Sequence, residues 1–221
     1  MTTSTDPQPS HPAPDVAGDP HDDPPPAQPS DPADAPWRQP NLPLAPGAPL
    51  WVFGYGSLMW NPEFAYTDRQ MALLHGYHRR FCVYSHRYRG TPEKPGLVLG
   101  LDHGGSCHGV AYQVAPERVP EVLTYLWGRE MVTGVYRPRL LPVELPDHHR
   151  VQACCFIADR RHQQYCGGLD PNQTLAMILN ASGARGPNAE YLLNTVDHLD
   201  ELGIEDAPLH ALAAKARAAV T

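Results

Sequence analysis

Glu130 stands where a stretch with helical periodicity ends, in the segment LTYLWGREMVTGVY. A Thr-Gly turn and a run of strand-forming residues follow it, so its carboxylate is expected at the end of an element near the interior. Partial burial there raises the pKa of a carboxyl group and suits it to general acid/base catalysis. The alternative is an ion pair with Arg129 or Arg137, and the spacing alone leaves both interpretations open.

A second stretch that could do chemistry is WVFGYGSLMW, in which small residues follow a short apolar run. Gly54, Gly56 and Ser57 let the backbone turn sharply and approach a ligand closely, and such a turn can aim N–H groups at an anion. The stretch does not match a dinucleotide-binding motif or a P-loop, and Tyr55 stands where a nucleophile elbow needs glycine. We therefore interpret Ser57 as a residue that satisfies the turn by hydrogen bonding to the backbone, rather than as a nucleophile.

Histidine and cysteine occur in patterns that predict neither a metal site nor a disulfide. The twelve histidines form no HExxH motif. The five cysteines are odd in number and include no CxxC pair, and the adjacent Cys154 and Cys155 are expected on opposite faces of a strand. This pattern fits reduced thiols in a cytoplasmic protein best.

Residues 1–49 differ in composition from the rest of the chain. They hold 15 of the 26 prolines and seven aspartates, with Arg38 as their single basic residue, and so carry −6 of the net charge of −7. Such a segment cannot bury enough apolar surface to offset its conformational entropy. We therefore predict a disordered tail over residues 1–49 and one folded domain over residues 50–221.

Several classes of partner are not expected for this domain. It is close to neutral and has no basic stripe with interleaved aromatic residues, which argues against nucleic-acid binding. No stretch is apolar for the roughly 18 residues that a membrane span needs. The residues after Met1 are polar, so a secretory signal is not expected either.

The strands and helices that position Glu130 and the turn at residues 54–57 can be predicted from the sequence: strands come first along the domain and helices later. Strands are expected over residues 50–54, 72–85 with a break near Gly76, 97–101, 108–114, 136–145 and 151–158, with HGGSC at 103–107 as a hairpin turn. Helices are expected over residues 116–130, 170–182, 188–203 and 208–220. Strands first and helices later predict an α+β fold, with a small mixed, mainly antiparallel β-barrel and flanking helices.

Five short motifs follow one another in order: WVFGYGSLMW, NPEF, HRRF, GREMVTGVY and GPNAEYL. This set, which extends from Leu50 to the last helix, resembles the ChaC-type γ-glutamylcyclotransferases, the glutathione-specific branch of that superfamily. The resemblance implies a small mixed α/β barrel that uses no metal or cofactor and cleaves glutathione to 5-oxoproline and Cys-Gly. It further implies that Glu130 is the acid/base and that Tyr136 lines the pocket. The residues that it implies for holding the γ-glutamyl group are Gly54, Tyr55, Gly56, Ser57, Leu58 and Met59.

The sequence departs from the family pattern in residues 131–135. Many eukaryotic members have a run of small residues there, often Gly-Gly, whereas this chain has MVTGV. That change bears on which group beyond the γ-amide is accepted, so other γ-glutamyl amines or amino acids stay alternative substrates. The alternative to an enzyme is a catalytically inactive protein that binds γ-glutamyl compounds on the same fold. The presence of Glu130 argues against it.

The sequence does not decide the roles of three further residues or the oligomeric state. Arg80 can be a clamp for the distal carboxylate of a peptide substrate or a charge on the surface. Glu190 and Tyr191 fit the start of a helix with Asn188 as its cap, so their recurrence in the family can be structural. The oligomeric state does not follow from the sequence.

Overall fold

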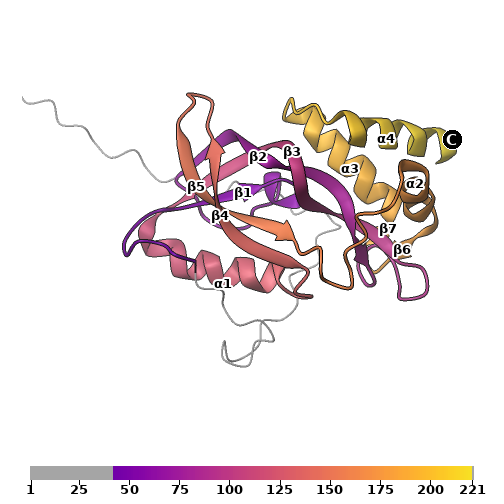
Figure 1. Cartoon of the computed structure of the whole chain (residues 1–221), viewed down its shortest axis with the longest axis horizontal. Helices are drawn as coiled ribbons and strands as arrows, with labels where there is room; N and C mark the ends of the chain where they lie inside the picture. The colour runs from indigo at the N-terminus through magenta and orange to yellow at the C-terminus, as the bar shows by residue number, and fades with distance from the viewer. Residues whose placement is uncertain (1–41, 221) are drawn as a thin grey trace, which may run out of the picture.

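The computed structural model describes residues 42–220, and its centre is a closed five-stranded barrel (Figure 1). The strands are β1 (Leu50–Gly54), β2 (Asp68–Ser85), β3 (Gly96–Val114), β4 (Tyr136–Glu144) and β5 (Arg150–Ala158). They follow one another around the barrel in the order β1-β3-β2-β4-β5. Neighbours pair antiparallel except that β5 runs parallel to β1 and, at one position, to β3. The predicted α+β fold with a mainly antiparallel barrel is confirmed.

Apolar side chains of the strands are buried on both faces of the barrel wall, because helices and loops cover parts of its outside. Val52 and Phe53 of β1, Tyr112 of β3 and Phe156 of β5 are almost completely buried. Each such side chain contributes about 1.5–3 kcal/mol when it leaves water. The barrel therefore forms a stable frame for the segments that lead out of its ends.

β2 and β3 form one long antiparallel pair, so the predicted hairpin turn at residues 103–107 is wrong. These residues continue β3 opposite β2. The register shifts at Gly76 of β2, which lies opposite Gly104 and Gly105 of β3, and all three glycines have positive φ. The glycines therefore make a β-bulge that bends the pair. The predicted break near Gly76 is this same bulge.

The helices lie outside the barrel in two groups (Figure 1). α1 (Val119–Glu130), which follows the 3₁₀ helix η3 (Pro116–Arg118), buries Val122, Leu126 and Trp127. α2 (Pro171–Asn180), α3 (Asn188–Glu201) and α4 (Ala207–Val220) pack on one another as the second group. Among residues 42–220 no helix is both long and apolar enough to cross a membrane.

Two short connections complete the described chain. The 3₁₀ helix η2 (Ser57–Met59) follows β1, and the strands β6 (Ser182–Gly183) and β7 (Gly186–Pro187) pair as a small hairpin between α2 and α3. η2 has particular importance because it lies in the stretch for which the sequence predicts ligand binding.

Asn188 fixes the start of α3 to the barrel. Its Oδ1 accepts a hydrogen bond from the N–H of Leu97 at 2.6 Å, and its Nδ2 donates to the Leu97 carbonyl at 2.8 Å. The side chain thus satisfies both backbone groups of a buried strand residue. The N-cap of α3 is Pro187, without a side-chain cap, so the expectation that Asn188 caps the helix is wrong.

The chain before β1 also contacts the folded part. Leu42 and Leu44 are partly buried and pack against the hydrophobic core. The predicted domain start at residue 50 stays a prediction, and residues 1–41 of the predicted tail lie outside the described residues.

Candidate active site

A pocket of about 100 Å³ opens beside the end of β1. Segments that are far apart in the sequence line it: the turn after β1, β3, the end of α1, the start of β4 and the first turn of α3. The lining residues are Tyr55, Gly56, Ser57, Leu58, Leu99, Glu130, Tyr136 and Tyr191. The fold therefore brings Glu130, Tyr136 and most of the predicted turn to one place.

Gly54 allows the turn to form by leaving room for η2. A Cβ added at Gly54 would lie 3.0 Å from the carbonyl carbon of Leu58 and 3.1 Å from its Cβ, which is closer than side chains normally approach. Gly54 itself does not line the pocket. Its role is to let the strand end and the 3₁₀ helix pack closely.

Gly56 has no side chain and so leaves open space in the pocket. Its φ of −132° is outside the left-handed region, and the absence of a side chain leaves space beside the pocket. An added Cβ would approach the Tyr191 hydroxyl at 3.9 Å and the side chain of Leu99 at 3.8 Å. A larger side chain at Gly56 would therefore extend into the volume available to a ligand.

The backbone of η2 offers hydrogen-bond donors to the pocket. The first hydrogen bond of this turn runs from the N–H of Met59 to the carbonyl of Gly56 at 2.8 Å, and no side chain caps the helix. N–H groups that precede the first bond have no partner within a helix. Those of Ser57 and Leu58 therefore have no partner within η2, and both residues line the pocket.

Glu130 supplies the carboxylate of the pocket, at the last position of α1. Its side chain is 18% exposed. Burial raises the pKa of Glu130, and the nearby Arg129 guanidinium offsets this only in part. Because the charged form is disfavoured, the carboxyl group can both accept and release a proton closer to neutral pH than an ordinary glutamate.

Arg129 connects Glu130 to the turn, a function that the sequence did not reveal. Its Nε lies 3.3 Å from a Glu130 oxygen, and its Nη2 donates to the Ser57 hydroxyl at 2.9 Å. It also donates to the hydroxyl of Tyr125 at 2.7 Å. The ion pair proposed from the sequence thus exists alongside the pocket position of Glu130, whereas Arg137 pairs with Asp159 instead.

Ser57 makes a different contact from the one expected. Its Oγ accepts the hydrogen bond from Arg129, and the printed sequence gave no sign that these two distant residues meet. The expectation that Ser57 satisfies the turn through the backbone is therefore wrong. Its hydroxyl helps to orient the guanidinium beside Glu130.

Tyrosine side chains form much of the remaining wall. The hydroxyl of Tyr136 donates to the Leu99 carbonyl at 2.6 Å. Burial raises the pKa of Tyr191 to about 12, and the neighbouring Leu99 backbone offsets this only in part. Burial likewise raises the pKa of Tyr55 and Tyr136, so these phenols stay protonated at neutral pH.

Tyr191 is the lining residue whose position the sequence explained only as the start of a helix. The guanidinium carbon of Arg89 lies 5.4 Å from the centre of its ring, and Phe81 packs edge-on against the ring at 5.8 Å. These contacts hold Tyr191 over the pocket. The motif NAEYL was the available signal, since it contributes both this residue and the Asn188 that fixes the helix.

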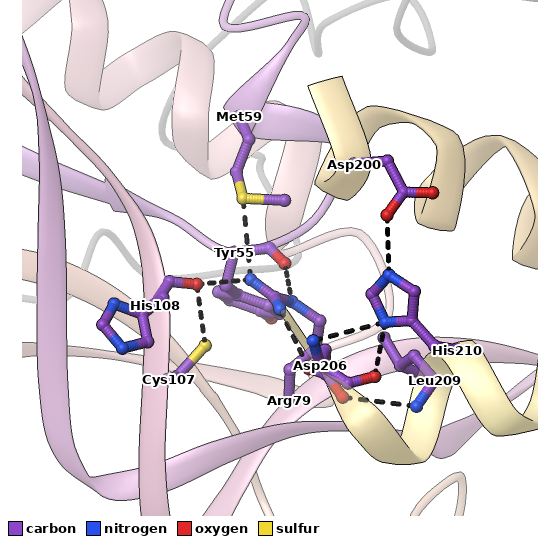
Figure 2. A network of polar contacts seen from close by, with 9 residues as sticks. All are labelled: Tyr55, Met59, Arg79, Cys107, His108, Asp200, Asp206, Leu209 and His210. Carbon is purple, nitrogen blue, oxygen red and sulfur yellow. Dashed lines mark hydrogen bonds and ion pairs between the residues drawn. The ribbon is translucent and has the colours of Figure 1, made fainter. Parts of the chain in front are cut away.

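Arg79 braces the turn from behind (Figure 2). Its side chain is 1% exposed; its Nε donates to the Tyr55 carbonyl and its Nη2 to the His108 carbonyl at 2.6 Å. Its Nη1 pairs at 3.0 Å with Asp206, which precedes α4. A buried guanidinium with several partners is geometrically fixed, so the turn is held against both β3 and the C-terminal helices.

Besides Gly54, two further candidate residues lie away from the pocket. Met59 is buried behind the turn, where its sulfur lies 3.6 Å from Nη2 of Arg79 and its carbonyl accepts from the Tyr112 hydroxyl. Arg80 lies 3.6 Å from Asp102 and does not line the pocket. Within residues 42–220 there is no cluster of three or more histidine, cysteine or acidic residues that could hold a metal ion.

The fold and the pocket define a small-barrel protein with one carboxylate and a turn of backbone donors at its binding site. The model of the ChaC-like protein family matches residues 50–219, and the chain belongs to that family. The resemblance inferred from the motifs is confirmed.

Relatives of known function agree with this assignment. A glutathione-specific gamma-glutamylcyclotransferase of Escherichia coli K12 is 42% identical over 164 residues, covering 74% of this chain and 71% of that protein. Glutathione-specific gamma-glutamylcyclotransferase 1 of Rattus norvegicus is 38% identical over 185 residues, covering 80% of this chain and 83% of that protein. The crystal structure of a yeast gamma-glutamyl cyclotransferase specific to glutathione superposes with a TM-score of 0.70 at 25% identity, covering 76% of this chain and 96% of that one.

Proposed function

We propose that this protein is a γ-glutamylcyclotransferase that cleaves glutathione to 5-oxoproline and Cys-Gly. The observation that carries the proposal is a single carboxylate of raised pKa, Glu130, in a pocket that is also lined by the turn of Gly56, Ser57 and Leu58. The names of the bacterial and mammalian relatives support glutathione as the substrate.

The reaction requires little chemistry from the protein beyond proton transfer. The α-amine of the γ-glutamyl group attacks its own γ-carbonyl carbon, and the new C–N bond closes a five-membered ring. The bond to the cysteine nitrogen then breaks, and its electron pair leaves with that nitrogen. Holding the two reacting groups in the attacking geometry can lower the barrier by roughly 7–11 kcal/mol.

Glu130 moves the proton in this proposal. It takes one proton from the α-ammonium group, which makes the nitrogen nucleophilic, and delivers it to the leaving cysteine nitrogen. The ring nitrogen gives up a second proton as the lactam forms, and the released amine of Cys-Gly takes up a proton to become an ammonium group. The raised pKa makes the carboxylate a better base than an ordinary glutamate. General acid/base catalysis of this kind accelerates a reaction by about 10²–10⁴-fold.

The other pocket groups bind and polarise the substrate. The N–H groups of Ser57 and Leu58 suit the α-carboxylate. Tyr191 lines the pocket and stays protonated at neutral pH, so its hydroxyl can donate to the γ-carbonyl oxygen, where negative charge develops. Tyr136 commits its proton to the Leu99 carbonyl and serves as a wall of the pocket.

The pocket volume fits the γ-glutamyl group rather than a whole tripeptide. About 100 Å³ leaves the Cys-Gly part of glutathione at the mouth. We further propose a cytoplasmic location, which the burial of all five free cysteines supports.

The proposal is tested by incubating the purified full-length protein with glutathione and measuring 5-oxoproline and Cys-Gly by mass spectrometry. γ-Glutamyl-alanine is assayed beside it, because it has the same head group without Cys-Gly. We expect equal amounts of the two glutathione products and much slower turnover of γ-glutamyl-alanine. Faster turnover of γ-glutamyl-alanine than of glutathione would show that glutathione is not the preferred substrate. If neither compound yielded 5-oxoproline, the protein would be a γ-glutamyl-binding protein and not an enzyme.

A further inference from the structure

A second and larger concavity lies on the outside of the barrel, between β4–β5 and the bent part of β2–β3. Its volume is about 720 Å³, inside the range of roughly 300–1,000 Å³ that is usual for small-molecule sites. It shares no lining residue with the pocket around Glu130. Successive residues of a strand face opposite sides, so Arg137 lies in this groove while Tyr136 lines the candidate active site.

The groove forms because the strands diverge on this side. β2 pairs with β4 at two positions near the far end of β4, and β3 pairs with β5 at Leu101 and Ile157. Between these contacts β4 faces a hollow instead of another strand. The side chains of Tyr77, Arg139 and Leu141 line it.

Two arginines of the groove are held in place by carboxylates. Arg137 binds Asp159 through Nη2 at 2.6 Å and through Nε at 2.8 Å. Arg160 binds Asp102 at 2.6 Å, and the side chain of Asp102 is 2% exposed. Because these guanidinium groups are already oriented, they lose little conformational freedom when they bind a ligand.

Two further arginines add positive charge without a side-chain ion pair, although the backbone N–H of Arg161 donates to Asp159 at 3.0 Å and its charge acts on that carboxylate. The side chains of Arg139 and Arg161 are exposed, and neither forms a hydrogen bond or ion pair with the part of the chain that the structure describes. The groove thus gathers four arginines around one lining carboxylate, Asp159. Like charges at short range repel one another, and a bound anion would remove that repulsion.

We propose that this groove binds a small molecule of nucleotide size that carries phosphate groups and a flat ring. A phosphate offers oxygens to several guanidinium groups at once. Tyr77 and His103 both line the groove and offer aromatic faces to the ring; their own rings lie 4.8 Å apart with planes tilted by 41°. The site is separate from the proposed γ-glutamylcyclotransferase activity and does not depend on it.

Isothermal titration calorimetry of the full-length protein tests the proposal, with ATP, tripolyphosphate and adenosine as probes in magnesium-free buffer at about 0.1 M salt. We expect ATP to bind most tightly, tripolyphosphate more weakly because it has no ring, and adenosine not measurably. The double variant Arg139→Gln/Arg161→Gln should weaken ATP binding by at least about tenfold, since two charge-assisted contacts are lost.

The matched control is Arg118→Gln/Arg150→Gln, which removes the same net charge at exposed positions outside the groove. We expect this control to bind ATP as tightly as the wild type. Thermal unfolding of both double variants is measured to check that they are folded. No ATP binding by the wild type, or an equal loss in both double variants, would overturn the proposal. Tripolyphosphate binding as tight as that of ATP would refute the contact with the ring.

Discussion

Glu130 is the residue on which the proposed chemistry depends, and an isosteric change isolates its proton transfer. Glu130→Gln keeps the shape of the side chain but cannot take a proton. We expect kcat for glutathione to fall by at least about 10²-fold, with substrate affinity largely kept. Steady-state kinetics and calorimetry with glutathione measure the two effects. If the variant kept more than a tenth of the wild-type kcat, the acid/base would have to be another residue.

The same substitution has a predictable effect on stability. Because the folded state raises the pKa of Glu130, the folded protein binds this proton more tightly than the unfolded chain. Ionisation of Glu130 therefore opposes folding, and its cost grows as the pH rises through the folded pKa. We expect Glu130→Gln to unfold at the same or a higher temperature than wild type near about pH 8, with the difference shrinking towards about pH 4.

Thermal unfolding monitored by circular dichroism over this pH range tests that sign. A lower unfolding temperature for the variant near neutral pH would show the opposite balance. It would mean that the ion pair between Arg129 and Glu130, at 3.3 Å, outweighs the cost of burying the carboxylate.

Gly56 and Ser57 are adjacent, yet they should respond differently to substitution. Gly56→Val places methyl groups in the ligand volume, while the neighbours of the added Cβ are 3.8 Å away or more. We expect KM for glutathione to rise strongly in a folded protein. Ser57→Ala removes one hydrogen bond to the charged Arg129 guanidinium, worth about 1.5–3 kcal/mol of stability. Arg129 keeps its contacts with Tyr125 and Glu130, so kcat should stay within roughly tenfold of wild type.

Steady-state kinetics with circular dichroism as the folding control compare these two variants. A folded Gly56→Val protein with a normal KM would mean that the turn does not touch the substrate. A folded but fully inactive Ser57→Ala protein would make Ser57 a direct participant in the chemistry.

At the scale of the elements, the connection before α4 contacts the turn after β1 through one buried arginine, Arg79. Asp206 pairs with Arg79, which in turn holds the Tyr55 carbonyl, and His210 of α4 contacts both Asp206 and Asp200 (Figure 2). The C-terminal helices therefore help to position the turn that is proposed to bind the substrate.

Asp206→Asn tests this link between elements. It removes the charge opposite a guanidinium that is 1% exposed, and the loss of a charged hydrogen bond costs about 1.5–3 kcal/mol. We expect a lower unfolding temperature and a KM that rises more than kcat falls, because the turn loosens while Glu130 stays in place. Calorimetric unfolding and steady-state kinetics measure both.

Asp200→Asn is the matched control, because the side chain of Asp200 is 60% exposed and binds His210 rather than Arg79. A surface pair of this kind contributes about 0–1 kcal/mol, so stability and KM should hardly change. Equal effects of the two variants would show that the helix packing, and not the Arg79 contact, positions the turn.

At the scale of the whole molecule, the composition of the acidic N-terminal segment predicts that it is separate from the folded domain. A proline- and aspartate-rich segment has little apolar surface with which to pack. We expect deletion of residues 1–41 to leave the turnover of glutathione and the unfolding temperature nearly unchanged. Deletion of residues 1–45 also removes Leu42 and Leu44, which pack against the core, and should lower the unfolding temperature. A clear loss on the shorter deletion would show that the segment docks on the domain.

Local signals in the sequence predicted much of the fold and part of the site. Periodicity located β1, β4, β5 and the four helices, because the residue types that favour each element act over a few neighbours. Glu130 stood out for the same reason, since the end of a helix and the following turn are both local features. The order of the motifs then indicated the family, which the match over residues 50–219 confirms.

The tertiary structure alone decided which distant residues meet. The glycines at 104 and 105 form a bulge rather than a hairpin turn because β2 continues opposite them. Arg129 reaches Ser57, and Tyr191 reaches the pocket, only once the barrel closes and α3 docks through Asn188. Such contacts depend on the relative placement of whole elements, which is set by packing across the core and leaves no periodic trace in the sequence near each residue.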